Sequence, residues 1–163
     1  MKKVAVVGGA GHVGFPLSLV IAESGLETIV IDINEEKINS IRNGEFPFVE
    51  RGGQELLDKS KDLPISYTTE YSVLKECDVI ILTIGTPIDE YHNPHLSPVY
   101  KTIDQLKPYL KDGQVLVLRS TLFPGTSEKI FARFQQEGMK ISVSFCPERI
   151  AQGYALEEIK RFP

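Results

Sequence analysis

The sequence predicts an α/β fold in which a doubly wound, mostly parallel sheet carries helices on both faces. Three observations support this prediction. Short apolar runs rich in β-branched residues recur along the chain, as expected for parallel strands that are covered on both sides. Segments with apolar residues at helical spacing separate these runs. A glycine-rich turn joins the first apolar run to the first helical segment, which is the arrangement of a Rossmann-type domain.

Strands and helices are expected to alternate along the whole chain. We expect strands at 4–7, 28–31, 65–68, 78–82, 115–118 and 141–145. We expect helical segments at 15–23, 35–42, 54–59, 70–76, 99–110 and 126–137, with Ile130, Phe131 and Phe134 facing inward in the last. The final strand alternates apolar and polar residues, which predicts an edge or half-exposed position. Right-handed crossovers then bring the loops that follow the strands to one edge of the sheet.

Size and composition exclude several classes of protein. The 163 residues are enough for one domain with its own core. A net charge of -4 without a basic cluster argues against nucleic-acid binding and against an anionic membrane surface. No apolar run is long enough for a membrane span, and no signal-peptide pattern precedes the first strand, so we expect a cytoplasmic protein. Cys77 and Cys146 do not have metal-ligand spacing, so we expect free thiols and no metal site.

The glycine turn at 9–14, with the sequence GAGHVG, predicts a phosphate site. Gly9 is expected to permit the tight turn, and Gly11 lets a pyrophosphate approach the backbone closely. Gly14 allows the helix to pack against the strand. The N-terminus of that helix offers free N–H groups and a partial positive charge, which favour an anion.

Asp32 follows the second strand and predicts which dinucleotide binds. A carboxylate there can accept hydrogen bonds from the adenosine ribose hydroxyls, and it would repel a 2′-phosphate. We therefore expect NAD rather than NADP. Residues 1–153 are expected to form the NAD-binding Rossmann domain, and 154–163 to begin a helix that connects to domains absent from this chain.

Three further loops follow strands and are expected at the same sheet edge. They lie at 83–89, 120–126 and 146–153. Taken singly, their Thr-Pro and Pro-Gly pairs and their Ser and Thr residues are consistent with ordinary turns and helix caps. Their common position at the carboxyl ends of strands is what indicates a functional site.

Together with the glycine turn, these loops resemble those of the nucleotide-sugar 6-dehydrogenases, the family of UDP-glucose and UDP-N-acetylhexosamine dehydrogenases. The matching stretches are 9–17, Gly85-Thr86-Pro87, Ser120-Thr121, Pro124-Gly125-Thr126 and Pro147-Glu148-Arg149-Ile150. The resemblance runs the length of the chain but covers only the family's NAD-binding domain. The stretch 92–97 and the Pro-Glu-Arg-Ile sequence resemble the N-acetylhexosamine branch more than the glucose branch, and UDP-glucose stays open as a substrate.

The resemblance implies oxidation of the C6 hydroxymethyl group of a UDP-sugar to a carboxylate, with two NAD, through a thiohemiacetal and a thioester. It implies two catalytic residues: Thr121, which helps hold the catalytic water, and Glu148, a general base or water-orienting group in thioester hydrolysis. Arg149 is expected to pair with Glu148 or with substrate. The residues expected to bind the cofactor are Gly9, Gly11, His12, Val13, Gly14, Asp32, Thr83, Gly85, Thr86, Thr121 and Glu148.

Departures from the family pattern limit what the chain alone can do. The family's nucleophilic cysteine and catalytic lysine belong to motifs that this sequence lacks, so we expect the 163 residues alone to be inactive. Cys77 is expected to be a core thiol, and Cys146 either a small packed residue or a reactive one. Glu50-Arg51-Gly52-Gly53 replaces the Glu-Pro-Gly-Leu of many relatives, which leaves the shape of that loop open.

The expected partners follow from the same resemblance. The UDP-sugar would bind mostly to the absent domains, and the full-length form is expected to be a homo-oligomer. Two other interpretations stay open: a non-catalytic module that senses NAD, and the domain of another β-hydroxyacid-type dehydrogenase.

Overall fold

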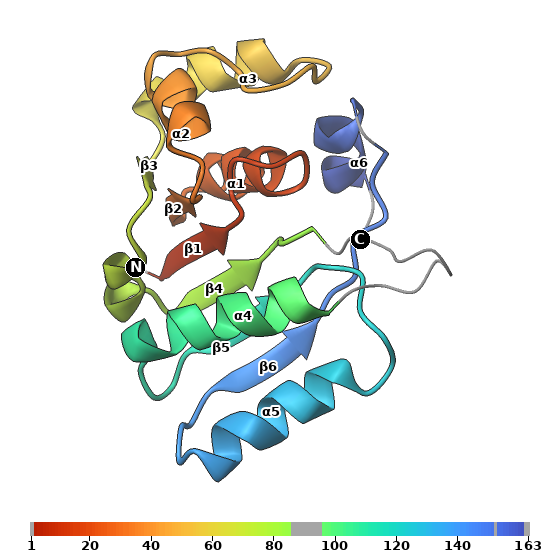
Figure 1. Cartoon of the computed structure of the whole chain (residues 1–163). Helices are drawn as coiled ribbons and strands as arrows, with labels where there is room; N and C mark the ends of the chain where they lie inside the picture. Colours follow the sequence, from red (N-terminus) through yellow and green to blue (C-terminus); the bar gives the residue numbers. More distant parts are fainter. Residues whose placement is uncertain (1, 86–95, 152, 162–163) are drawn as a thin grey trace.

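The computed structural model describes residues 2–85, 96–151 and 153–161 and shows one six-stranded sheet in which every neighbouring pair is parallel (Figure 1). The strand order is β3-β2-β1-β4-β5-β6. The strands are β1 (Lys3–Val7), β2 (Glu27–Ile31), β3 (Ile65–Thr68), β4 (Val79–Leu82), β5 (Val115–Leu118) and β6 (Ser142–Phe145). The expected doubly wound parallel sheet is therefore confirmed, with the chain reversing its direction of winding between β1 and β4.

The helices cover both faces of this sheet, as expected (Figure 1). They are α1 (Gly14–Glu23), α2 (Glu35–Arg42), α3 (Gly53–Lys59), α4 (Ser97–Leu106), α5 (Thr126–Gln136) and α6 (Ala155–Arg161). Short 3-10 turns are η1 (Ser60–Asp62), η2 (Tyr71–Glu76) and η3 (Lys107–Tyr109). The segment 70–76, expected to be helical, is thus a 3-10 turn, and the helix expected to reach residue 110 ends at Leu106.

Successive residues of each central strand point to opposite faces, and this alternation divides the core into two layers. Ala5 and Val7 of β1 pack in a cluster with α4 and α5, which contribute Ile103 and Phe134. Val6 of β1 is fully buried on the other side of the sheet. The neighbouring clusters on that side contain residues of α1, α2, α3 and α6. Two covered faces explain why the strand sequences are apolar without alternation.

One helix detail agrees with the sequence expectation and another does not. Asn34 caps α2 as expected, because its Oδ1 accepts a hydrogen bond from the Lys37 amide at 3.0 Å. Phe131 does not face inward: its side chain is 44% exposed, because Ile130 and Phe134 occupy the side of α5 that faces the sheet. β6 is an edge strand with mostly exposed residues, as expected.

The segment 155–161 forms the expected helix, and α6 packs back against α1 (Figure 1). Ala155 and Leu156 are buried, and Lys160 pairs with Glu23 at the end of α1 at 2.6 Å. Within the described ranges, every helix is too short or too polar to cross a membrane.

Candidate functional site

The glycine turn lies where β1 ends beside β2 and β4. The amides of Gly8 and Gly9 both donate to the Ile31 carbonyl, at 2.9 and 3.0 Å, which ties the turn to the end of β2. The left-handed residue is Gly8, with a φ of 80°, so the tight turn expected at Gly9 lies one residue earlier. Gly9 is required for packing instead, since a Cβ there would lie 2.6 Å from the Val6 carbonyl oxygen.

Gly14 and Gly11 have different surroundings. A Cβ on Gly14 would overlap the Gly8 carbonyl oxygen and lie 2.7 Å from Thr83 Oγ1, so α1 contacts the ends of β1 and β4 directly. Thr83 fixes this junction by donating from Oγ1 to the Val7 carbonyl at 2.9 Å. A Cβ on Gly11 would meet only the Gly8 carbonyl oxygen, at 3.2 Å. One side of Gly11 is therefore open for a ligand.

Asp32 lies beside this turn, at the end of β2. Its Oδ2 accepts from the Ala10 amide at 3.0 Å, and its Oδ1 accepts from the Asn34 amide at 3.0 Å. The half-buried carboxylate therefore has a fixed orientation next to the glycine turn. His12 in the turn is exposed and stacks on Phe48 of the 45–53 loop, with ring centroids 4.1 Å apart.

A hollow of about 280 Å³ brings the motif loops together. It is lined by Val13, Thr83, Ile84, Gly85, Arg119, Ser120, Thr121, Glu148 and Ile150. Segments that follow β4, β5 and β6 thus meet the start of α1 in one place, as the parallel topology requires. Five of the expected site residues line it, while Thr86 lies outside the described residues. Gly9, Gly11, Gly14 and Asp32 lie in the adjoining turn and at the end of β2.

Glu148 is the most strongly held polar side chain of this hollow. Its Oε1 accepts from the amides of Arg149 and Ile150, at 2.7 and 2.8 Å. Its Oε2 forms an ion pair with Arg119, which directly follows β5. The expected pairing of the Arg149 side chain with Glu148 is therefore wrong, because Arg149 contributes its backbone amide and Arg119 contributes the guanidinium; the alternative, a pairing of Arg149 with substrate, stays a prediction.

Arg119 lines this hollow and pairs with Glu148, and the sequence reasoning missed it. Its amide donates to the Leu82 carbonyl at 3.0 Å, which continues the pairing of β5 with β4 beyond the strand. Burial lowers the pKa of its guanidinium. The available signal was a single arginine at the end of an otherwise apolar strand, next to the Ser-Thr pair.

The two cysteines lie in different environments. Cys77 is buried, as expected, and burial raises the pKa of its thiol to about 11. Cys146 is exposed, so the expectation of a small packed residue is wrong; its Sγ lies 3.7 Å from Ser144 Oγ. Neither thiol lines the hollow with Glu148. In the described part of the chain, no group of three or more His, Cys, Asp or Glu residues could hold a metal ion.

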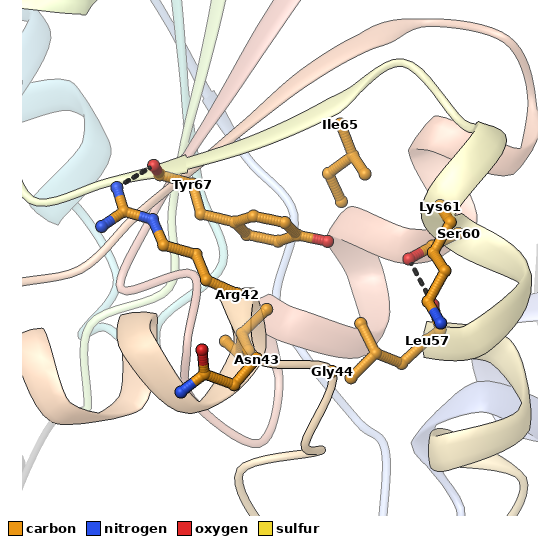
Figure 2. Close-up of a pocket in the computed structure, with 9 residues that line it drawn as sticks. Arg42, Asn43, Gly44, Leu57, Ser60, Lys61, Ile65 and Tyr67 are labelled. Carbon is orange, nitrogen blue, oxygen red and sulfur yellow. Dashed lines mark hydrogen bonds between the residues drawn. The ribbon is translucent and has the colours of Figure 1, made fainter.

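A second hollow of about 280 Å³ lies at the β3 edge of the sheet (Figure 2). It is lined by Ile41, Arg42, Asn43, Gly44, Leu57, Ser60, Lys61, Ile65 and Tyr67. Arg42 donates to the Tyr67 carbonyl at 2.7 Å and so occupies an acceptor of the edge strand (Figure 2). This hollow contains none of the motif residues, and it faces the start of β3 rather than the loops that follow the strands.

A parallel sheet in the order 3-2-1-4-5-6, with a glycine turn at the switch point and an acidic residue after β2, defines a dinucleotide-binding domain of the Rossmann class. Residues 2–163 match the sequence profile described as "UDP-glucose/GDP-mannose dehydrogenase family, NAD binding domain". The chain belongs to this family, and its cofactor is NAD.

Relatives agree with this assignment. The chain is 33% identical to UDP-N-acetyl-D-mannosamine dehydrogenase from Methanococcus maripaludis, over 98% of this chain and 37% of the relative. It is 35% identical to UDP-N-acetyl-D-glucosamine 6-dehydrogenase from Pseudomonas aeruginosa, over 93% of this chain and 36% of the relative. The chain therefore spans little more than a third of the length of these curated relatives.

Solved structures give the same result. The UDP-N-acetyl-mannosamine dehydrogenase Cap5O from Staphylococcus aureus superposes with a TM-score of 0.87 at 30% identity, covering 97% of this chain and 39% of that one. A 3-hydroxyisobutyrate dehydrogenase from Mycobacterium tuberculosis shares only the fold, at 14% identity and a TM-score of 0.63, over 93% of this chain and 42% of that one. The comparisons therefore favour a nucleotide-sugar dehydrogenase over the β-hydroxyacid-type alternative.

Proposed function

We propose that this chain is the NAD-binding part of a UDP-sugar 6-dehydrogenase that acts on UDP-N-acetylmannosamine or UDP-N-acetylglucosamine. The observation that carries the proposal is the meeting of Thr83, Thr121 and Glu148 in one hollow beside the glycine turn. The names of the relatives support the choice of sugar. The reaction would convert the C6 hydroxymethyl group into a carboxylate with two NAD.

The glycine turn fits the pyrophosphate of NAD. Gly11 leaves open space beside the backbone, and no side chain caps the start of α1. Among the first residues of α1, the Phe15 amide already donates to the Gly11 carbonyl at 3.0 Å and Pro16 has no N–H, so the Gly14 amide is the one left for a phosphate oxygen, and the helix N-terminus favours its charge. NAD would supply the hydride acceptor, and Gly9, Gly11, His12, Val13 and Gly14 would hold it at this end.

Asp32 fits the adenosine ribose, because its carboxylate is fixed next to the turn by two backbone amides. A charged oxygen so placed favours two free ribose hydroxyls over a 2′-phosphate. Thr83, Gly85 and Thr86 would lie along the ribose and pyrophosphate.

Thr121 and Glu148 are proposed to act at the reacting end, on the water that cleaves the thioester. Thr121 is exposed and lines the hollow, and the Glu148 carboxylate is held by two backbone amides and by Arg119. A fixed carboxylate can orient a water by accepting one of its hydrogens.

A second candidate function is a module that binds NAD and catalyses nothing. The absence of a cysteine from the lining of the described hollow favours it for this chain in isolation. We further propose that 1–153 forms the NAD-binding unit, that 154–163 begins a connection to other domains, and that the full-length protein is a homo-oligomer.

The test of the cofactor site is calorimetric titration with NAD and NADP. We expect NAD to bind at least about tenfold more tightly, and we expect Asp32→Asn to narrow that ratio by removing the charge that repels a 2′-phosphate. Glu35→Gln is the matched control, because it removes an exposed carboxylate in the first turn of α2 and should leave the ratio unchanged. Equal affinities of the unmodified chain for both dinucleotides would contradict the role of Asp32.

A further inference from the structure

Arg119 lies between two hollows that meet at Glu148. It lines the hollow of about 280 Å³ with Thr121, and also a smaller one of about 160 Å³ that faces Glu158 of α6. The Arg119 and Glu148 side chains are only 21% and 12% exposed. Within the described ranges, Glu148 is the only acidic partner of this guanidinium, whose Nε is buried without an acceptor.

The pairing gives Glu148 a complete set of donors from two chain segments. Its own segment supplies the two backbone amides, and the end of β5 supplies the guanidinium. A carboxylate that accepts hydrogen bonds from several N–H groups, one of them cationic, is stabilised in its ionised form. Because one oxygen is held from each side, the carboxylate plane is also fixed.

Few other charges face this pair. In the parts that the structure describes, Glu158 approaches from α6, but its Oε2 already accepts from the Ala151 amide at 2.6 Å. Arg149 and Cys146, which lie on the same segment as Glu148, are both exposed. The guanidinium of Arg119 is therefore the dominant charge at Glu148.

We propose that Arg119 is a positioning residue that holds the Glu148 carboxylate ionised and in one orientation at the wall of the hollow. This assignment rests on the proposed function and deepens it, because it distinguishes between the two roles expected of Glu148, a general base and a group that orients water. A carboxylate held this way is a permanent hydrogen-bond acceptor that orients water. It does not suit a general base with a pKa near neutral pH, because a carboxyl group reaches such a pKa by burial without a neighbouring cation.

The test follows the Glu148 carboxyl carbon by NMR during a pH titration of the 163-residue chain with labelled glutamate, and the signal is assigned by its loss in Glu148→Gln. In the unmodified chain we expect the midpoint of the Glu148 titration to lie below the ordinary glutamate value of about 4.3. In Arg119→Gln the midpoint should rise by at least about one pH unit. Arg119→Lys, which keeps the charge, should recover most of that shift.

Arg149→Gln is the control, because it removes a neighbouring positive charge without removing the ion pair. We expect its midpoint to move by no more than about 0.3 pH units. An Arg119→Gln chain that keeps its amide spectrum and its Glu148 midpoint would overturn the proposal, as would an equal shift in Arg149→Gln. If Arg119→Gln does not fold, the unmodified chain still decides, since a midpoint at or above about 4.3 excludes a held carboxylate. The readout uses neither NAD nor a UDP-sugar, so its failure is distinct from failure of the proposed function.

Discussion

Gly11 and Gly14 belong to one turn, but the structure requires a missing Cβ at each for a different reason. At Gly14 the requirement is internal, because a methyl group would overlap the Gly8 carbonyl oxygen and press on Thr83. At Gly11 the packing of the protein gives little reason to exclude a side chain, since only one atom lies within 4 Å of an added Cβ. The open side of Gly11 therefore points to a ligand requirement rather than a folding requirement.

Gly11→Val is accordingly expected to fold and to lose NAD binding, because the side chain would occupy the space of the pyrophosphate. Gly14→Ala is expected to lower the free energy of unfolding by about 1–3 kcal/mol, since the added methyl group overpacks backbone that cannot move aside. Urea denaturation and calorimetry measure the two effects separately. A folded Gly11→Val chain that binds NAD normally would show that the pyrophosphate lies elsewhere.

Cys77 gives a pH dependence of known sign. Burial raises the pKa of its thiol from an ordinary value of 9.0 to about 11 in the folded chain, so the unfolded chain loses this proton first. The stabilisation is complete below about pH 9 and is lost as the pH rises to about 11. We expect the stability difference between the unmodified chain and Cys77→Ala to shrink over this window. A difference that stays constant from pH 8 to 11 would contradict the argument.

Some residue assignments could not be read from the sequence because they depend on neighbouring strands. The pairing of Arg119 with Glu148 exists only because β5 and β6 are adjacent and end together. Local spacing pointed instead to Arg149, which is next to Glu148 in the chain. The left-handed position is at Gly8 rather than Gly9, in a turn whose two amides both donate to the end of β2.

At the scale of elements, the sequence determined the strands better than the helix faces. A strand covered on both sides needs an uninterrupted apolar run, and β4 and β5 show one. A helix only needs enough apolar residues on one side, so periodicity placed Ile130 and Phe134 correctly and Phe131 incorrectly. The packing of α6 on α1 had no local signal, because it depends on where the chain returns after β6.

We expect α6, which follows the proposed 1–153 unit, to stabilise that unit by packing on α1. Leu156 is only 7% exposed and joins the cluster that contains Phe15 and Leu56. Leu156→Ala should therefore lower the free energy of unfolding by about 2–4 kcal/mol, because it leaves a cavity under the helix. Glu157→Ala, exposed on the same helix, should change it by less than about 0.5 kcal/mol in urea denaturation. Equal, small effects would mean that α6 does not contribute to the stability of the domain.

At the scale of the whole molecule, the described residues of the expected site lie at one edge of the sheet. The glycine turn, Asp32 and the Glu148 hollow all lie beyond the carboxyl ends of the strands, whereas the hollow of Figure 2 is at the β3 edge. The expected cofactor-binding residues that the structure describes therefore lie together at this edge. The described residues provide no matching thiol beside it, because Cys77 is buried in the core and Cys146 does not line the hollow.

The 163-residue chain is therefore expected to bind NAD without oxidising a UDP-sugar. The proposed reaction would need a thiolate to hold the C6 aldehyde as a thiohemiacetal, while bound NAD would supply the hydride acceptor and water would cleave the resulting thioester. Neither described thiol lines this hollow, so nothing there holds the sugar carbon against the cofactor, and positioning contributes about 7–11 kcal/mol to such reactions. Incubation with NAD and UDP-N-acetylmannosamine, UDP-N-acetylglucosamine or UDP-glucose should give no NADH absorbance above a protein-free control. Steady NADH formation that disappears in Cys146→Ser but persists in Cys77→Ser would place the nucleophile at the end of β6. Cys146 is the thiol to test there, because it is exposed and lies shortly before Glu148 in the sequence.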